Sequence, residues 1–77
     1  MQPIVIYSSD FCGYCNAAKA LLKQQGLTYT EINVSRDPQQ RQVMMERSKQ
    51  RTVPQIFFGD THIGGFTDLQ AYFKNKK

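Results

Sequence analysis

Apolar positions along the chain recur at two different spacings, and the spacing changes from segment to segment. Residues 3–8, PIVIYS, form a short apolar run with β-branched side chains, which predicts a strand buried on both faces. From Asn16 to Gln25 the apolar positions follow helical spacing instead, and Gly26 stands where a helix would stop. The start of the chain therefore predicts a strand followed by a helix.

Turn and cap residues divide the rest of the chain into further elements. We expect a strand at 28–34, a helix from Asp37 to about Lys49, strands at 55–58 and 61–64, and a last helix with Leu69, Tyr72 and Phe73 on its inner face. Asp37 suits an N-cap and Pro38 the first helical position. Gly59 and Asp60 favour a tight hairpin turn. The predicted order is β-α-β-α-β-β-α.

This order limits how the strands can pair. The first β-α-β unit requires a parallel pair with a right-handed crossover, whereas the hairpin requires an antiparallel pair. We therefore expect an α/β fold in which a four-stranded mixed sheet is covered by three helices. With 77 residues, the chain is expected to form a single domain over residues 1–77.

Composition and charge narrow the class of protein. Hydrophobic residues make up 40% and charged residues 21%, which is typical of a globular domain. The apolar run near the start, Ile4 to Tyr7, is too short for a signal peptide or a membrane span, so we expect a cytoplasmic protein without a membrane partner. The net charge of +4 comes from scattered residues, with a cluster only at Lys74, Lys76 and Lys77. We expect no nucleic-acid partner, because no basic patch is interleaved with aromatic residues.

Cys12 and Cys15 are the only cysteines, and three roles compete for them. A structural disulfide is disfavoured because the loop would be very small and the expected compartment is reducing. A structural zinc site needs four ligands, and the only histidine, His62, is expected to be exposed or hydrogen-bonded in its short strand. A reactive dithiol fits best, because Cys-x-x-Cys beside a β-α-β pattern is typical of thioredoxin-like redox chemistry.

The position of the pair suggests how the two thiols divide the work. If Cys12 lies just before the first helical turn, unpaired backbone N–H groups and the helix dipole favour its thiolate. Cys15, one turn later and more buried, would then act as the resolving thiol. Cys12 is thus the expected nucleophile.

Two further segments carry backbone chemistry. A proline that opens a strand, as in Thr52-Val53-Pro54, suits a bend that presents neighbouring backbone groups to a ligand. Gly64-Gly65 permits close approach of a backbone, and the helix start at Thr67-Asp68 supplies N–H groups suited to a carboxylate. Taken alone, each segment is better interpreted as an ordinary loop or turn.

Together, the segments YSSDFCGYC, RTVPQIFF and HIGGFTDL resemble a dithiol glutaredoxin along essentially the whole chain. The resemblance implies a thioredoxin-like fold and a monomer that uses glutathione as co-substrate to reduce glutathionylated and disulfide-bonded substrates. It implies a redox disulfide between Cys12, the nucleophile, and Cys15. The glutathione-binding residues it implies are Tyr14, Arg41, Thr52, Val53, the cis proline Pro54, Thr67 and Asp68. Among these, Val53 would pair through its backbone with the cysteinyl part of glutathione, Thr67 and Asp68 would hold the γ-glutamyl carboxylate, and Arg41 the glycine carboxylate.

Two residues depart from the family pattern. Ser9 stands where family members usually carry a lysine, which removes a contact worth roughly 1 kcal/mol unless Arg41 or Arg51 replaces it. Gly13 stands where the family most often has proline, and glutaredoxins without that proline resemble carriers that bridge a [2Fe-2S] cluster between two subunits through the first cysteine, here Cys12, and glutathione. A cluster carrier and a protein recharged by thioredoxin reductase are therefore the alternatives.

Overall fold

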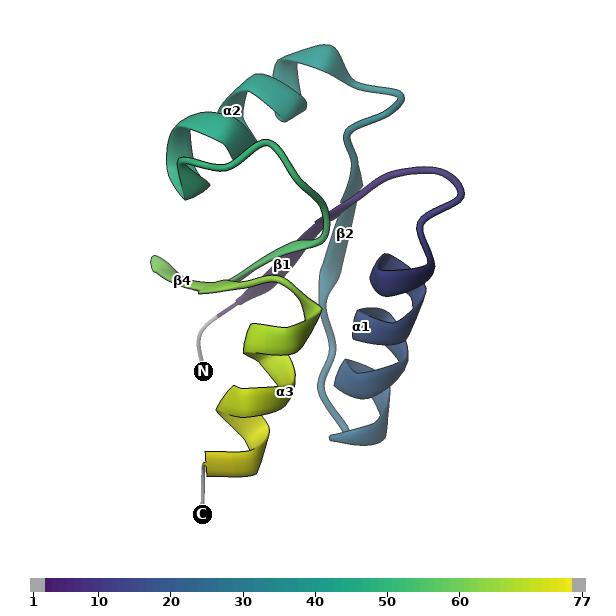
Figure 1. Cartoon of the computed structure of the whole chain (residues 1–77), viewed down its shortest axis with the longest axis vertical. Helices are drawn as coiled ribbons and strands as arrows, with labels where there is room; N and C mark the ends of the chain where they lie inside the picture. The colour runs from purple at the N-terminus through teal and green to yellow at the C-terminus, as the bar shows by residue number, and fades with distance from the viewer. Residues whose placement is uncertain (1–2, 76–77) are drawn as a thin grey trace.

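A mixed four-stranded sheet forms the centre of the molecule, as the computed structural model of residues 3–75 shows (Figure 1). The elements are β1 (Ile4–Ser8), α1 (Gly13–Gln24), β2 (Thr30–Asn33), α2 (Pro38–Ser48), β3 (Gln55–Phe58), β4 (Thr61–Gly64) and α3 (Phe66–Asn75). The strands lie in the order β2-β1-β3-β4. β1 pairs parallel with β2, and β3 pairs antiparallel with both β1 and β4. This confirms the predicted element order and the mixed sheet; residues 1–2 and 76–77 of the predicted domain lie outside the described residues.

The helices cover both faces of the sheet because successive strand residues point to opposite sides. On one face, Ile6 and Ile56 pack against α1 and α3, whose inner residues include Leu22 and Leu69. On the other face, Tyr7, Val34 and Phe57 pack against Met44 of α2. In Figure 1, α1 and α3 accordingly lie near each other, and α2 lies apart from them. Both cysteines come from the loop and helix that follow β1 in the middle of the sheet.

Helix α1 begins at Gly13, three residues before the predicted start at Asn16. The apolar spacing does not extend into this turn, because Gly13 and Tyr14 are exposed; the expected place of Cys12, just before the first helical turn, is confirmed. Cys12 caps the helix with its sulfur. At the other end, the N–H of Leu27 reaches the carbonyl of Leu22 at 3.0 Å, and Gly26 adopts the positive φ of +73° that such a stop requires.

The other predictions hold with small changes of boundary. Asp37 caps α2 by accepting from the N–H of Gln40 at 3.2 Å, and Pro38 is the first helical residue. β2 is shorter than predicted, four residues instead of seven, because the pairing with β1 ends at Asn33. Among residues 3–75, no helix is long and apolar enough to cross a membrane.

Candidate active site at the start of helix α1

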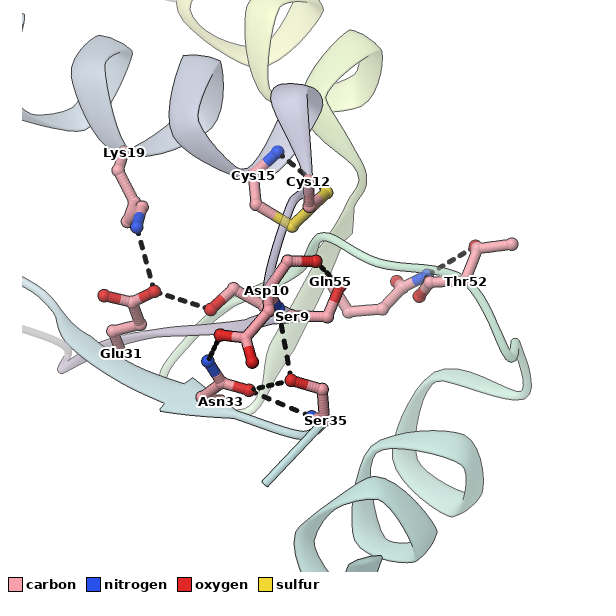
Figure 2. Close-up of a disulfide and its surroundings, with 11 residues drawn as sticks. Ser9, Asp10, Cys12, Cys15, Lys19, Glu31, Asn33, Ser35, Thr52 and Gln55 are labelled. Carbon is pink, nitrogen blue, oxygen red and sulfur yellow. Dashed lines mark hydrogen bonds and ion pairs between the residues drawn. A yellow bond between two sulfur atoms is a disulfide. The ribbon is translucent and has the colours of Figure 1, made fainter. Parts of the chain in front are cut away.

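Cys12 and Cys15 form a disulfide at the first turn of α1 (Figure 2). The two Cα atoms lie 5.2 Å apart. The N–H of Cys15 donates to the sulfur of Cys12 at 3.2 Å, so this sulfur occupies the place of a capping oxygen. Cys15 is 1% exposed, whereas Cys12 is only partly buried. Cys12 is therefore the more accessible of the two cysteines to an attacking thiolate or a substrate disulfide.

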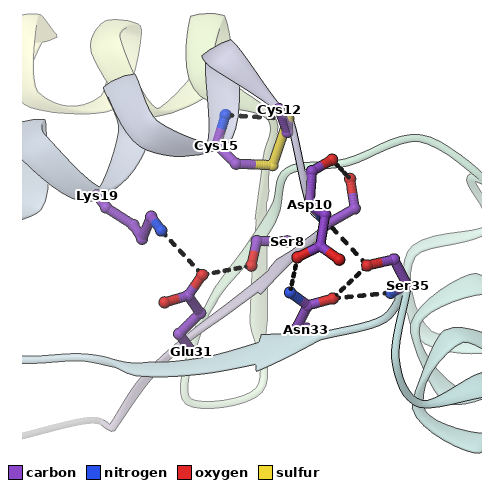
Figure 3. Close-up of polar contacts among 9 residues, drawn as sticks. Ser8, Asp10, Cys12, Cys15, Lys19, Glu31, Asn33 and Ser35 are labelled. Atoms are coloured by element: carbon purple, nitrogen blue, oxygen red, sulfur yellow. Dashed lines mark hydrogen bonds and ion pairs between the residues drawn. A yellow bond between two sulfur atoms is a disulfide. The ribbon is translucent and has the colours of Figure 1, made fainter.

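The loop before Cys12 is tied to the segment between β2 and α2. The side chain of Asn33 donates to one carboxylate oxygen of Asp10 at 2.9 Å, and Arg36 lies 3.4 Å from the other. The N–H of Asp10 also donates to the hydroxyl of Ser35 at 3.1 Å (Figure 3). The Asn33 hydrogen bond, followed by Arg36, lowers the pKa of Asp10. These contacts hold a loop whose next residue, Phe11, has a φ of +56° and a fully exposed ring.

A second polar cluster joins β1, β2 and α1 beneath the disulfide. The buried hydroxyl of Ser8 donates to Glu31 at 2.6 Å, and Lys19 forms an ion pair with the same carboxylate oxygen at 2.9 Å (Figure 3). The Ser8 hydrogen bond, and secondly the Lys19 contact, lower the pKa of Glu31. This cluster links the last residue of β1 to the helix that Cys12 caps and that contains Cys15.

A cavity of about 240 Å³ lies beside the redox pair and brings three segments of the chain together. Six of the seven predicted glutathione-binding residues line it: Tyr14, Thr52, Val53, Pro54, Thr67 and Asp68. The seventh, Arg41, is exposed on α2 and is not part of the lining, so its role stays a prediction. Within the described part of the chain, neither a lysine nor an arginine lines the cavity.

Contacts between separate segments bring the walls of this cavity together. The Val53–Pro54 peptide bond is cis, as expected. The ring of Tyr14, one residue before Cys15, lies 6.0 Å from the ring of Phe66 at the start of α3, which joins the redox helix to the opposite wall. Gly65 lies against the carbonyl of Pro54, where an added Cβ would be 3.5 Å away. The three motifs that are separate in sequence thus meet at one place.

Asp68 is fixed at the start of α3. One of its carboxylate oxygens accepts from the N–H of Gly65 at 3.1 Å, which is one half of a capping box. Gly64 makes this possible, because it adopts a φ of +120° and any Cβ at this position would collide with the Asp68 carboxylate. The glycine pair therefore serves the placement of a charged group beside the cavity.

Four lining residues were not among the predicted site residues: Gln50, Gln55, Gly65 and Phe66. Gly65 belongs to the glycine pair that the sequence singled out for close backbone approach, and Phe66 lies between that pair and Thr67. Gln55 is a buried polar residue, 1% exposed, directly after Pro54. Nothing in the sequence pattern distinguishes it from an exposed strand residue.

The structure also bears on the metal and histidine predictions. Among the residues that the structure describes, no three or more His, Cys, Asp or Glu side chains come close enough to hold a metal ion. His62 is hydrogen-bonded, as predicted, with its Nε2 atom 2.7 Å from the amide oxygen of Gln55.

A sheet of this topology, with a Cys-x-x-Cys disulfide at the start of its first helix, defines a thioredoxin-like thiol–disulfide oxidoreductase. The family model described as Glutaredoxin matches residues 4–63. The chain therefore belongs to the glutaredoxin family.

Individual relatives agree with this assignment. Glutaredoxin of Neisseria meningitidis serogroup A is 49% identical over 70 residues, which are 90% of this chain and 82% of the relative. The solution structure of glutaredoxin from Brucella melitensis is 44% identical with a TM-score of 0.85, covering 100% of this chain and 84% of that one. The crystal structure of a buckwheat glutaredoxin–glutathione complex is 31% identical with a TM-score of 0.86, covering 96% and 70%. The protein is thus a glutaredoxin oxidoreductase with a Cys-x-x-Cys redox pair.

Proposed function

We propose that this glutaredoxin uses glutathione as its electron donor and reduces glutathionylated thiols as well as protein and small-molecule disulfides. The observation that carries the proposal is the cavity beside the disulfide, which is lined by the residues expected to hold glutathione. The related buckwheat protein, solved as a complex with glutathione, supports the same ligand.

Glutathione would lie across the cavity with its sulfur at Cys12. Its cysteinyl backbone would pair with Val53, beside Thr52 and Tyr14. The γ-glutamyl carboxylate would accept from backbone N–H groups of Thr67 and Asp68 at the start of α3, where the helix dipole favours an anion. The γ-glutamyl ammonium group would face the carboxylate of Asp68.

Cys12 would act as the nucleophile toward a glutathionylated protein. Its thiolate attacks the glutathione sulfur, the bond between that sulfur and the protein sulfur breaks, and the protein leaves as a thiolate. A second glutathione thiolate then attacks the sulfur of the bound glutathione, which releases glutathione disulfide and restores the Cys12 thiolate. The N–H of Cys15 is already directed at the Cys12 sulfur and favours its negative charge in both steps.

Cys15 would be needed for substrates that contain a disulfide. Cys12 attacks one substrate sulfur and releases the other as a thiolate. The Cys15 thiolate then attacks the Cys12 sulfur, which forms the Cys12–Cys15 disulfide and releases the second substrate thiolate. Two glutathione molecules reduce this disulfide and leave as glutathione disulfide.

The test is turnover on a glutathionylated peptide, coupled to glutathione reductase and NADPH. Cys12→Ser is expected to lower the rate at least about a thousandfold, because serine is not ionised at neutral pH and forms no disulfide. Asp68→Asn keeps an acceptor for the Gly65 N–H and removes the charge, so it should raise the KM for glutathione about fivefold. Retained activity in Cys12→Ser would disprove the assigned nucleophile.

The glycine carboxylate of glutathione has a separate test. Arg41→Gln should raise the KM for glutathione about threefold, and less at high salt, because a surface charge is screened. Lys23→Gln removes the same charge from an exposed position at the end of α1 and serves as the control. An equal change of the KM in both variants would show that Arg41 does not contact glutathione.

Two measurements distinguish the alternatives. Glutathione alone should reduce the oxidised protein; reduction by thioredoxin reductase with NADPH but not by glutathione would overturn the proposed donor. Anaerobic reconstitution with iron, sulfide and glutathione should leave a colourless monomer. A coloured dimer would instead assign cluster binding to Cys12.

A further inference from the structure

Gln55 is a buried amide that connects a strand to the wall of the cavity. Its Nε2 atom donates to the carbonyl oxygen of Thr52 at 3.0 Å, to the hydroxyl of Thr52 at 3.2 Å and to the side-chain oxygen of Gln50 at 2.9 Å. Its Oε1 atom lies 2.7 Å from Nε2 of His62 on β4. Figure 2 shows the Gln55 side chain directed from β3 toward Thr52. Every polar atom of the buried amide thus has a partner.

The direction of this hydrogen-bond chain follows from its end. The carbonyl oxygen of Thr52 can only accept, so the NH₂ group of Gln55 must face it. The amide oxygen of Gln55 then faces His62, whose Nε2 atom must carry a hydrogen to complete the bond. The chain therefore runs in one direction, from His62 through Gln55 to Thr52.

Two members of the chain, Gln55 and His62, belong to strands of the sheet. The backbone of Gln55 pairs with Tyr7 of β1 in the antiparallel register. The ring of His62 stacks on Phe57, with the centroids 4.8 Å apart and the planes inclined by 27°. Thr52, in contrast, is exposed and lies in the connection between α2 and β3. Gln55 thus connects the exposed segment before the cis proline to the sheet.

We propose that Gln55, oriented by His62, is a positioning residue that holds the backbone of Thr52 and Val53 in place for glutathione. The inference rests on the proposed binding of glutathione in this cavity. Gln55 acts through Thr52 and takes no part in the sulfur chemistry. Replacing Gln55 should therefore raise the KM for glutathione and leave the reactivity of the Cys12–Cys15 pair unchanged.

Gln55→Leu removes the whole chain of hydrogen bonds, and the KM for glutathione should rise about tenfold, because the carbonyl and hydroxyl of Thr52 lose the donor that holds them. Reduction of insulin driven by dithiothreitol needs the dithiol but no glutathione, and its rate should stay within about twofold. Ile56→Val is the control, since Ile56 is buried in the opposite face of the same strand. It should lower the melting temperature without changing the KM.

A second variant tests the direction of the chain without touching Gln55. His62→Phe keeps a ring against Phe57 and removes the Nε2 donor, so the KM should rise about threefold. In the double variant the His62 substitution should add nothing to Gln55→Leu, because His62 acts only through the amide. If the two substitutions instead raised the KM independently, so that their effects multiplied, the proposal that His62 acts through Gln55 would be wrong.

The outcomes separate this inference from the proposed function. If Asp68→Asn raises the KM for glutathione but Gln55→Leu does not, the positioning role is wrong and the binding site stands. If neither variant changes the KM, both fall. If Gln55→Leu slows the dithiothreitol reaction as much as the glutathione reaction, its effect lies in the redox pair and the positioning role is again wrong.

Discussion

The backbone N–H of Cys15 points at the sulfur of Cys12 across 3.2 Å, so the more accessible cysteine caps the helix that contains the other. One hydrogen bond thereby serves two purposes. It satisfies a helix N–H that has no partner within the helix, and it places the partial positive charge of that N–H next to the sulfur of the candidate nucleophile.

The Cys15 side chain should be dispensable for this contact. Cys15→Ser keeps the backbone N–H, so turnover on a glutathionylated peptide should stay within about threefold of the unchanged protein. Reduction of a protein disulfide such as that of insulin, driven by glutathione, should fall at least about a hundredfold, because no second thiol releases the mixed disulfide. Loss of both activities would show that Cys15 also serves the monothiol reaction.

Ser9 offers a gain-of-function test. Its hydroxyl makes only a weak local contact with the carbonyl of Asp10 at 3.5 Å, and the cavity lining contains no lysine or arginine among the described residues. Ser9→Lys should supply a charge-assisted contact and lower the KM for glutathione about fivefold, the equivalent of roughly 1 kcal/mol. Gln24→Lys, at the far end of α1, adds the same charge and should change little. An unchanged KM in Ser9→Lys would mean that this position does not face glutathione.

Gly64 should tolerate no side chain. Gly64→Ala forces an unfavourable backbone angle and displaces the Asp68 carboxylate, so we expect about 2 kcal/mol of lost stability together with a higher KM for glutathione. Gly26→Ala is the matched control, because Gly26 also has a positive φ but open space around a Cβ. It should lose stability and keep the KM. Chemical denaturation and steady-state kinetics measure the two effects, and an unchanged KM in Gly64→Ala would contradict the role of Asp68.

Acid should weaken the Ser8–Glu31–Lys19 cluster. Because the pKa of Glu31 is lowered in the folded protein, its contribution to stability is complete above its ordinary pKa and is lost as the pH falls through the folded value. Glu31→Gln should therefore cost about 1 kcal/mol or less at pH 7, a modest value because the Glu31 side chain is 37% exposed, and less at about pH 3. Urea denaturation at both values measures this, with Glu46→Gln on the exposed side of α2 as control. A difference that did not decrease between pH 7 and about pH 3 would show that the charge of Glu31 is not responsible.

Local patterns in the sequence determined the element types and the chemistry of the redox pair. The cap at Asp37, the turn at Gly59 and the spacing of Cys12 and Cys15 each depend on residues close together in the chain, so their structural consequences can be predicted without the rest of the molecule. The start of α1 was wrong by three residues, because the sulfur that caps it carries no apolar signal.

The tertiary structure alone decided what surrounds the pair. The antiparallel pairing of β1 with β3 brings the Thr52–Pro54 segment beside the cysteines, whereas Arg41 stays outside the cavity lining. No local sequence pattern specifies this pairing. The same pairing buries Gln55, whose amide then requires His62 as a partner. Burial and long-range hydrogen bonds depend on which strands become neighbours, so the residues they recruit become visible only once the sheet is assembled.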